Sequence, residues 1–323
     1  MQDTFGRSIN YLRLSVTEAC NFNCNYCAPE GRTRIDASPL SLDEITRVVR
    51  AAVALGIVNI RLTGGEPLLR RDIVEIVCAL VAIPGVRDVA LTTNAFRLAE
   101  LAQALKDAGL ARANISLDSL QRERFAKIVG VDAFDLVWRG IETAERVGFA
   151  PLKINAVILR DVNDDEVNAF ARLSVDRAWS VRFIELMPVG VTDAAREFFA
   201  RHFVSAREIQ ARLPALEPVT SHAERGNGPA KIFRLPNARG TIGFITAASD
   251  HFCAMCNRIR ITARGEARSC LFGNDGFDVR AAINGDDTKL QRLLTEVVNS
   301  KPECHPLGDE FQIVAGAMAE IGG

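Results

Sequence analysis

The stretch EACNFNCNYCAP, residues 18–29, places Cys20, Cys24 and Cys27 at the spacing CxxxCxxC. It directly follows a β-rich run, INYLRLSV at residues 9–16, and an amphipathic helical stretch comes after it. In parallel β/α barrels the loops at the C-terminal ends of the strands carry the functional residues, so this position suits a binding site. Three thiols are one ligand short of a closed zinc site, and disulfides would need an even number of them.

The alternation of strand and helix patterns continues from this stretch to about residue 187. Six β-rich runs are separated by helical stretches, and they lie at residues 9–16, 58–63, 86–93, 112–118, 151–159 and 180–187. The helical stretch SLDEITRVVRAAVALG opens with a capping box formed by Ser41 and Glu44. Strands that alternate with helices indicate parallel β/α units with right-handed crossovers.

This α/β pattern predicts an incomplete (β/α)6 TIM-type barrel. A Rossmann sheet is disfavoured because no GxGxxG follows the first strand. An open, doubly wound sheet stays as the alternative on pattern alone.

Past residue 188 the alternation ends. Strand-like runs then occur at residues 230–236, 240–246 and 257–265. We therefore predict two parts, a partial barrel over residues 1–188 and a smaller α+β region over residues 189–323 that closes the open side of the barrel. The second part carries another cysteine triple, so both triples can face one cavity. That triple consists of Cys253, Cys256 and Cys270.

Composition limits the classes of function. The chain has 323 residues, of which 48 % are hydrophobic, so it can bury a large core. A net charge of −1 gives no global basic field for nucleic acid, and an anionic ligand must be held by a local cluster of cations. No signal peptide pattern and no run of roughly 20 apolar residues is found, so we expect a cytoplasmic protein without a membrane partner. In such a reducing compartment, eight cysteines favour metal ligands or small buried side chains over disulfides.

Three thiolates suit a cubane 4Fe-4S cluster, because they leave one iron open for a small molecule. Zinc completed by a distant His or Cys is the alternative, and His251 beside the second triple is the obvious fourth ligand. Cys78 lies in the apolar helical stretch DIVEIVCALVAI and is interpreted as a core residue. Cys304, in KPECHPLG, carries too little context for a role.

The motifs resemble those of the radical S-adenosylmethionine (radical SAM) superfamily. An aromatic residue, Tyr26, precedes the last cysteine of the first triple, and the loop TGGEP follows the second strand. Within that superfamily the whole chain resembles one family, the GTP 3′,8-cyclases of molybdenum cofactor biosynthesis. The resemblance runs through LRLSVTEACNFNCNYC, RLTGGEPLLRRD, LTTN, NISLDSL, NDDE, RFIELMPVG, CAMCNRIRITARGEARSC and the terminal Gly322-Gly323.

This resemblance implies the cofactors and the reaction. The first triple would hold a 4Fe-4S cluster that cleaves S-adenosyl-L-methionine, and the second triple would hold another 4Fe-4S cluster facing the guanine of GTP. Hydrogen abstraction from the ribose C3′, attack on guanine C8 and a final reduction would give (8S)-3′,8-cyclo-7,8-dihydroguanosine 5′-triphosphate. The implied partners are GTP, an unidentified electron donor and cyclic pyranopterin monophosphate synthase, which receives the product, and a homodimer is allowed.

The resemblance also assigns site residues. S-adenosylmethionine would contact Tyr26, Gly65, Ser116 and Met187. GTP would contact Arg13, Arg61, Thr92, Lys153, Arg182, Arg258, Ile259 and Arg260. Roles in catalysis would fall to Arg258, Arg260, Gly322 and Gly323.

The residues themselves support part of this assignment. Four cations lie within predicted strands, where a charge is costly unless it meets an anion or a polar cavity, and these are Arg13, Arg61, Lys153 and Arg182. Together they favour a polyanionic ligand such as a triphosphate, which suits the forked guanidinium group. Pairing with Asp or Glu at one end of the barrel is the alternative, and the choice of guanine over adenine depends on the resemblance alone. Ala95, where the family usually has Gly after TTN, puts only the local turn in doubt.

Two other functions stay open from the sequence. One is a radical enzyme with an auxiliary cluster that acts on another substrate, for example a peptide. The other is a non-catalytic module that binds zinc at both triples.

Overall fold

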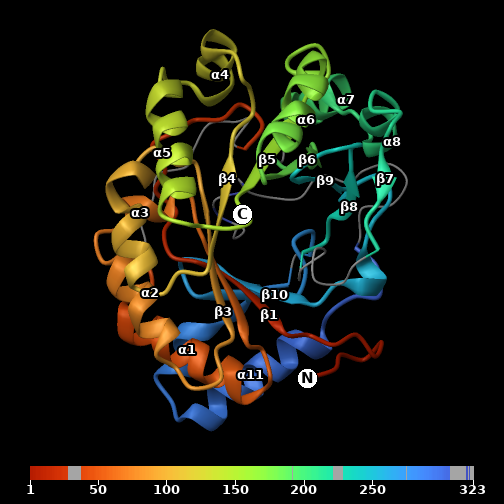
Figure 1. The fold of residues 1–323 in the computed structure, drawn as a ribbon. Coiled ribbons are helices and arrows are strands. Elements are labelled where there is room, and N and C mark those ends of the chain that lie inside the picture. Colours follow the sequence, from red (N-terminus) through yellow and green to blue (C-terminus); the bar gives the residue numbers. More distant parts are fainter. Residues whose placement is uncertain are drawn as a thin grey trace.

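The computed structural model describes residues 1–27, 38–190, 192–220, 228–273 and 275–305, together with Met318 and Glu320. Within these residues one mostly parallel β-sheet runs through the whole molecule, with helices packed against it (Figure 1). The α/β fold class predicted from the sequence is therefore confirmed.

All six predicted strands of the first part are present. They are β1 (Tyr11–Ser15), β2 (Asn59–Thr63), β3 (Asp88–Thr93), β4 (Arg112–Ser116), β5 (Lys153–Ile158) and β6 (Ser180–Glu185). Each pairs in parallel with the next one along the chain. Parallel neighbours require a crossover, and helices supply it in each case.

The helices between these strands are amphipathic and cover the sheet. They are α1 (Leu42–Ala54), α2 (Ile73–Val81), α3 (Leu98–Asp107), α4 (Arg122–Val129), α5 (Phe134–Arg146) and α6 (Val167–Asp176). The interpretation of Cys78 as a core residue is wrong, because Cys78 lies on the exposed face of α2. The predicted capping box is confirmed, since the Glu44 N–H donates to Ser41 Oγ at 3.2 Å and the Ser41 N–H donates to Glu44 Oε2 at 2.7 Å. Figure 1 shows α1, α2, α3 and α5 along one side of the strands.

The chain beyond residue 188 adds strands to the same sheet. These are β7 (Glu217–Pro218), β8 (Lys231–Arg234), β9 (Thr241–Ile245), β10 (Arg258–Ile261), β11 (Glu266–Arg268) and β12 (Phe277–Asp278). The described helices of this region are α7 (Asp193–His202), α8 (Ala206–Ala211), α10 (Val279–Ile283) and α11 (Asp287–Asn299). Helix α11 packs against α1, so the end of the chain returns to its beginning (Figure 1).

The strand order of the sheet is β12-β11-β10-β1-β2-β3-β4-β5-β6-β9-β8-β7. Strand β10 pairs in parallel with β1, and β9 pairs in parallel with β6. Strands β10 and β11 pair antiparallel and form a hairpin. The late strands thus extend both edges of the early sheet, which the sequence pattern did not predict.

Alternation along the strands separates a core face from a polar face. On β1, Leu12 and Leu14 are fully buried in the hydrophobic core, while Arg13 between them lines a cavity on the other face. Successive side chains of a strand point to opposite faces, so this arrangement follows from the sequence YLRLS of β1. Among the described residues, none of the helices is both long and apolar enough to span a lipid bilayer.

Candidate active site

Both cysteine triples line one cavity of about 300 Å³. Its wall is built from residues of the parallel strands and from the loops that follow them. The sequence prediction that the two triples face a common space is therefore confirmed. The cysteines concerned are Cys20, Cys24, Cys27, Cys253, Cys256 and Cys270.

The loop of the first triple is held by the TGGEP loop. The Gly65 N–H donates to the Thr17 carbonyl oxygen at 2.8 Å, and the Glu66 N–H donates to that of Ala19 at 2.7 Å. A Cβ atom at Gly65 would lie 2.3 Å from the Ala19 carbonyl oxygen, a distance that no side chain tolerates. The paired glycines are thus needed for two loops to run side by side, in addition to any approach of a ligand.

Glu66 ties three loops together from a buried position. Its carboxylate accepts hydrogen bonds from the Leu68 N–H at 3.0 Å, the Thr93 hydroxyl at 2.7 Å and the Asn94 N–H at 2.6 Å. Burial raises the pKa of Glu66 to about 7, against the opposing effect of these donors. Sequence reasoning missed this residue, and the only available signal was an acidic residue directly after two glycines at a strand end.

Asn94 connects the TTN turn to the first triple. Its side-chain amide donates to Asn21 Oδ1 at 2.9 Å and lies 3.9 Å from the sulfur of Cys20. The amide therefore fixes the loop and sits next to one of the sulfur ligands. Such donors to sulfur tune the potential of iron–sulfur clusters.

Tyr26 and Asp118 form a buried pair beside the first triple. The Tyr26 hydroxyl donates to Asp118 Oδ2 at 2.7 Å, and Asp118 Oδ1 accepts from the Val157 N–H at 2.9 Å. Burial raises the pKa of Asp118 to about 6. Burial, with the Asp118 charge, also raises the pKa of Tyr26 well above its usual range. The tyrosine ring is consequently fixed in orientation at the wall of the cavity.

The donor chemistry of the first triple fits an iron–sulfur cluster. The thiols of Cys20, Cys24 and Cys27 are half-buried and line the same cavity. The cavity also receives Gly65, Ser116 and Met187, the residues expected to contact S-adenosylmethionine. A thiolate set with adjoining space is what a cluster with one open iron needs.

The second triple lies around β10. Cys253 opens the short 3-10 helix η3 (Cys253–Met255), and Cys256 follows it. Lys301 connects β10 with the segment before Cys270, since its ammonium donates to the carbonyl oxygens of Arg258 at 3.0 Å and Ser269 at 2.7 Å. Lys301 also lines the cavity, and sequence reasoning missed it because it lies far beyond the motifs.

The two cysteines beside η3 have different electrostatic surroundings. Burial opposes the ionisation of Cys256, but the charges of Lys301 and Arg258 lower its pKa below the usual value. Burial raises the pKa of Cys253 to about 11 in the metal-free chain, and the neighbouring thiols of Cys304 and Cys270 add to the effect. The thiolate form, which is the metal ligand, is therefore favoured first at Cys256.

A row of arginines crosses the floor of the cavity. Arg13 is in register with Arg61 on β2 and with Arg260 on β10, so three neighbouring strands present a guanidinium group at one level. Burial, together with Arg260 and Arg61, lowers the pKa of Arg13 well below its usual range. The pKa of Arg260 falls to about 10 for the same reasons, chiefly burial and the charge of Arg258. Such a row is unfavourable unless an anion offsets it.

Three arginines of the cavity have no carboxylate partner in the described part of the chain. Among the described residues, Arg61, Arg182 and Arg258 form no ion pair with Asp or Glu. Arg61 Nε instead donates to the Tyr11 hydroxyl at 2.8 Å, and the Arg258 guanidinium lies 5.1 Å from the centre of the Phe252 ring. For these arginines the alternative of pairing at one end of the sheet has no support, and a polyanionic ligand is favoured.

Most predicted substrate residues meet at this cavity. Those that line it are Arg13, Arg61, Thr92, Arg182, Arg258 and Arg260. Lys153 and Ile259 are not part of its lining. Lys153 is buried on β5, where burial and the charges of Arg182 and Arg112 lower its pKa to about 6. Ile259 is fully buried in the hydrophobic core, so only its backbone could take part in binding.

The C-terminal end of the chain approaches the first triple. The Met318 N–H donates to the Cys27 carbonyl oxygen at 3.1 Å, and Met318 lines the cavity. Gly322 and Gly323, predicted to act in catalysis, lie outside the described residues.

Comparisons with known proteins agree with this geometry. A family model described as the radical SAM superfamily matches residues 14–174, and one described as Molybdenum Cofactor Synthesis C matches residues 179–307. The chain is 47 % identical to the GTP 3′,8-cyclase of Geobacter sulfurreducens over 99 % of both chains. It is 44 % identical to the GTP 3′,8-cyclase of Pelotomaculum thermopropionicum over the full length of both.

Solved structures show the same fold at low sequence identity. SuiB of Streptococcus suis, crystallised with S-adenosylmethionine, matches with a TM-score of 0.62 at 16 % identity, covering 91 % of this chain and 66 % of that one. The protein anSMEcpe, with bound AdoMet and a peptide, matches with a TM-score of 0.55 at 14 % identity, covering 87 % and 79 %. At such identities the likeness concerns the fold alone.

Proposed function

The chain belongs to the GTP 3′,8-cyclase family of the radical SAM superfamily, and from that premise we propose that its two cysteine triples and the cations of the shared cavity form one active site. The reaction is the conversion of GTP into (8S)-3′,8-cyclo-7,8-dihydroguanosine 5′-triphosphate, the first step of molybdenum cofactor biosynthesis. One observation carries the assignment of the site, namely that both triples and the arginine row line a single cavity.

The first triple holds the cluster that works with S-adenosylmethionine. When bound there with S-adenosylmethionine, a reduced 4Fe-4S cluster would supply the electron that cleaves this cofactor, and the 5′-deoxyadenosyl fragment would take the hydrogen atom from the ribose C3′. Tyr26, Gly65, Ser116 and Met187 position the cofactor. Tyr26 suits this task because its hydroxyl is fixed by Asp118 at 2.7 Å.

The arginine row binds the triphosphate. Arg13, Arg61 and Arg260 present their guanidinium groups at one level of the sheet, where forked donors can contact several phosphate oxygens. Arg182 adds positive charge from β6, and Thr92 adds a hydroxyl donor. Lys153 on β5 adds positive charge once it takes up a proton on ligand binding. A bound triphosphate relieves the mutual repulsion of these cations, so part of the binding energy comes from the protein itself.

The second triple orients the base. Cys253, Cys256 and Cys270 would hold the second 4Fe-4S cluster, which would supply a binding site for the guanine. Arg258 and Arg260 lie on β10 directly after Cys256 and act on the reacting nucleotide, together with Gly322 and Gly323 of the tail. Ile259 contributes through its backbone, since its side chain is buried in the core.

Several wider features belong to the same proposal. Strands β1–β6 form the incomplete (β/α)6 barrel, and the region over residues 189–323 closes it. The ligand cysteines require a reducing compartment, which favours the cytoplasm. An electron donor reduces the clusters, the product passes to cyclic pyranopterin monophosphate synthase, and a homodimer is compatible with these roles.

An anaerobic turnover assay tests the proposed function. The cluster-loaded chain should release 5′-deoxyadenosine only when a reductant is present, and GTP should be consumed much faster than ATP. Cleavage of S-adenosylmethionine with GTP left unchanged would favour a radical enzyme that acts on another substrate. About two zinc ions per chain, in place of roughly eight iron atoms, would favour a zinc-binding module.

A further inference from the structure

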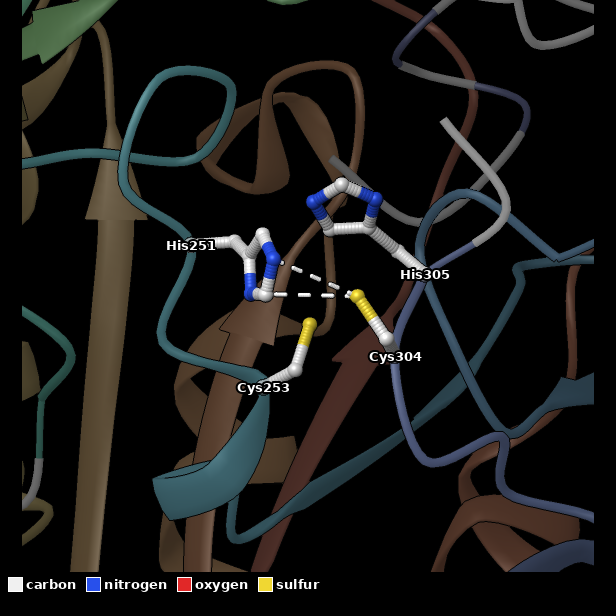
Figure 2. Close-up of side chains that lie close together, drawn as sticks. All are labelled: His251, Cys253, Cys304 and His305. Carbon is white, nitrogen blue, oxygen red and sulfur yellow. Dashed lines mark hydrogen bonds between the residues drawn. The ribbon is translucent and has the colours of Figure 1, made fainter. Parts of the chain in front are cut away.

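Four metal-ligand side chains meet at the edge of the second triple. The ligand atoms of His251, Cys253, Cys304 and His305 all lie within 4.8 Å of one another (Figure 2). The Cys304 sulfur is 3.3 Å from Nε2 and 3.8 Å from Nδ1 of His251. The residues come from two segments far apart in the sequence, one before β10 and one after α11. The fold therefore creates a grouping that the sequence spacing does not reveal.

Two thiolates and two imidazoles are a common donor set of tetrahedral zinc. At normal zinc–sulfur and zinc–nitrogen bond lengths, the ligand atoms of a tetrahedron are about 3.3 to 3.8 Å apart. The observed atoms need to move by only about 1 Å to reach that spacing. The two thiolates also balance the charge of a divalent cation, so the occupied site has no net charge.

This grouping is distinct from the ligand set of the second cluster. A cubane binds each cysteine to a different iron and so keeps its sulfur ligands further apart than a single ion does. Cys256 and Cys270 are absent from the grouping, and His251, Cys304 and His305 are absent from the proposed cluster ligands. Cys253 alone belongs to both.

We propose that His251, Cys253, Cys304 and His305 form a mononuclear site for a divalent cation of the zinc class, and that this cation competes with the second 4Fe-4S cluster for Cys253. The competition rests on the proposed function, because it takes Cys253 as a cluster ligand. His251 and Cys304 are exposed, so the ion can enter from solvent before the cluster is assembled. A chain filled with zinc at this site would lack one ligand of the second cluster.

A cobalt titration tests the mononuclear site. Full-length chain without clusters, with serine at the first triple to remove its thiols, is titrated anaerobically with Co²⁺, whose absorption bands report tetrahedral sulfur ligation. We expect one Co²⁺ per chain, displaced by Zn²⁺. Loss of a residue that only hydrogen-bonds to a metal ligand already weakens metal sites by about 10- to 100-fold, so Cys304→Ser and His305→Asn should weaken binding by at least about tenfold.

Cys270→Ser is the matched control, because it removes a cluster ligand outside the mononuclear site. It should bind Co²⁺ as tightly as the parent chain. Strong binding that is lost in Cys270→Ser but kept in Cys304→Ser would overturn the proposal, since the ion would then use the second triple itself. Circular dichroism before the titration confirms that each variant is folded, and exposed Cys304 tolerates the change.

Cluster reconstitution tests the competition. Zinc added before iron and sulfide should lower iron uptake at the second triple in the parent chain, by up to about four iron atoms, and should leave Cys304→Ser unaffected. Equal iron uptake with and without zinc in the parent chain would overturn the competition. Failure of zinc-free Cys304→Ser to assemble a second cluster would contradict the proposed function instead, and the cobalt titration would still decide the mononuclear site.

Discussion

At the scale of the residue, buried ionisable groups control the site. Glu66 is 1 % exposed and fully enclosed by three hydrogen-bond donors at the junction of the first loops. Its ionisation therefore changes the stability of the region that supports the first triple. The buried arginines of the cavity, such as Arg13 and Arg260, also have shifted pKa values. Burial and the repulsion between neighbouring arginines both lower them.

The substitution Glu66→Gln should change the pH dependence of stability. Because the pKa of Glu66 is raised from 4.5 to about 7 on folding, the folded chain binds this proton more tightly than the unfolded chain. The stabilisation is full below pH 4.5 and is lost as the pH rises through about 7. From pH 5 to pH 8, cluster-free wild type should lose at most about 3 kcal/mol more unfolding free energy than Glu66→Gln.

Denaturant unfolding at several pH values measures this difference. Asp118, with its pKa raised to about 6, titrates in both chains and cancels in the comparison. Parallel pH profiles for the two chains would show that Glu66 does not titrate in this range.

Lys153 should take up a proton when GTP binds. Its pKa of about 6 in the free chain leaves the amine neutral at pH 8, and a nearby triphosphate raises that pKa again by attraction. Phosphate groups are already ionised at this pH, since their second pKa is about 6. Calorimetry of GTP binding at pH 8 in two buffers of different ionisation enthalpy should give close to one proton for wild type and none for Lys153→Met. Equal uptake by both chains would place Lys153 away from the phosphates.

The substitution Ala95→Gly should stabilise the chain. Ala95 has φ 62°, in the left-handed region, which costs a residue with a Cβ atom about 1 kcal/mol or more. Glycine avoids this cost but loses backbone entropy, so a gain of up to about 1 kcal/mol is expected in denaturant unfolding. The control Ala104→Gly, on the exposed face of α3, should destabilise by about 1 kcal/mol. A loss of stability on Ala95→Gly would show that the left-handed backbone conformation of Ala95 is not strained.

The role of a residue could be predicted from the sequence where all residues of the motif lie close together along the chain. The triple of Cys20, Cys24 and Cys27 is readable because its spacing is contained in one loop. The role of Glu66 could not be predicted, since two of its three donors, Thr93 and Asn94, lie at the end of another strand. The grouping of Cys304 with His251 depends on two distant segments meeting in space, and no local spacing reports it.

At the scale of the element, β10 completes the cation row. It lies far along the chain from β1 yet pairs with it in parallel, which brings Arg260 next to Arg13. The six early strands could be predicted because each repeats the same strand, loop and helix pattern. The attachment of β9 and β10 to the two sheet edges could not, because strand pairing between distant segments leaves no periodic signal.

The C-terminal tail is the second element with a predicted role. Met318 already contacts Cys27, and the chain ends five residues later. Deletion of Gly322 and Gly323 should abolish conversion of GTP and leave the iron content unchanged, because no cysteine ligand is removed. Product formation and iron content measured on the same anaerobic sample test this, and full activity of the shortened chain would refute a catalytic tail.

At the scale of the whole molecule, one sheet brings two distant cysteine triples to one cavity. The strand order places β1 and β10 side by side, so the loops after the first strand and before β10 share a wall. The fold thus provides the shared space that the proposed site requires, in which the chemistry at the first triple acts on a nucleotide held at the second. The triples lie far apart in the sequence, but they meet in space because β10, which follows Cys256, pairs with β1, which precedes Cys20.

Turnover with GTP deuterated at the ribose C3′ tests this arrangement most directly. If the nucleotide lies between the two triples with its ribose toward the first, the 5′-deoxyadenosine released under anaerobic, reducing conditions should carry deuterium, as mass spectrometry can show. GTP deuterated elsewhere on the ribose should leave it unlabelled. Unlabelled 5′-deoxyadenosine from the C3′-deuterated substrate would contradict the account.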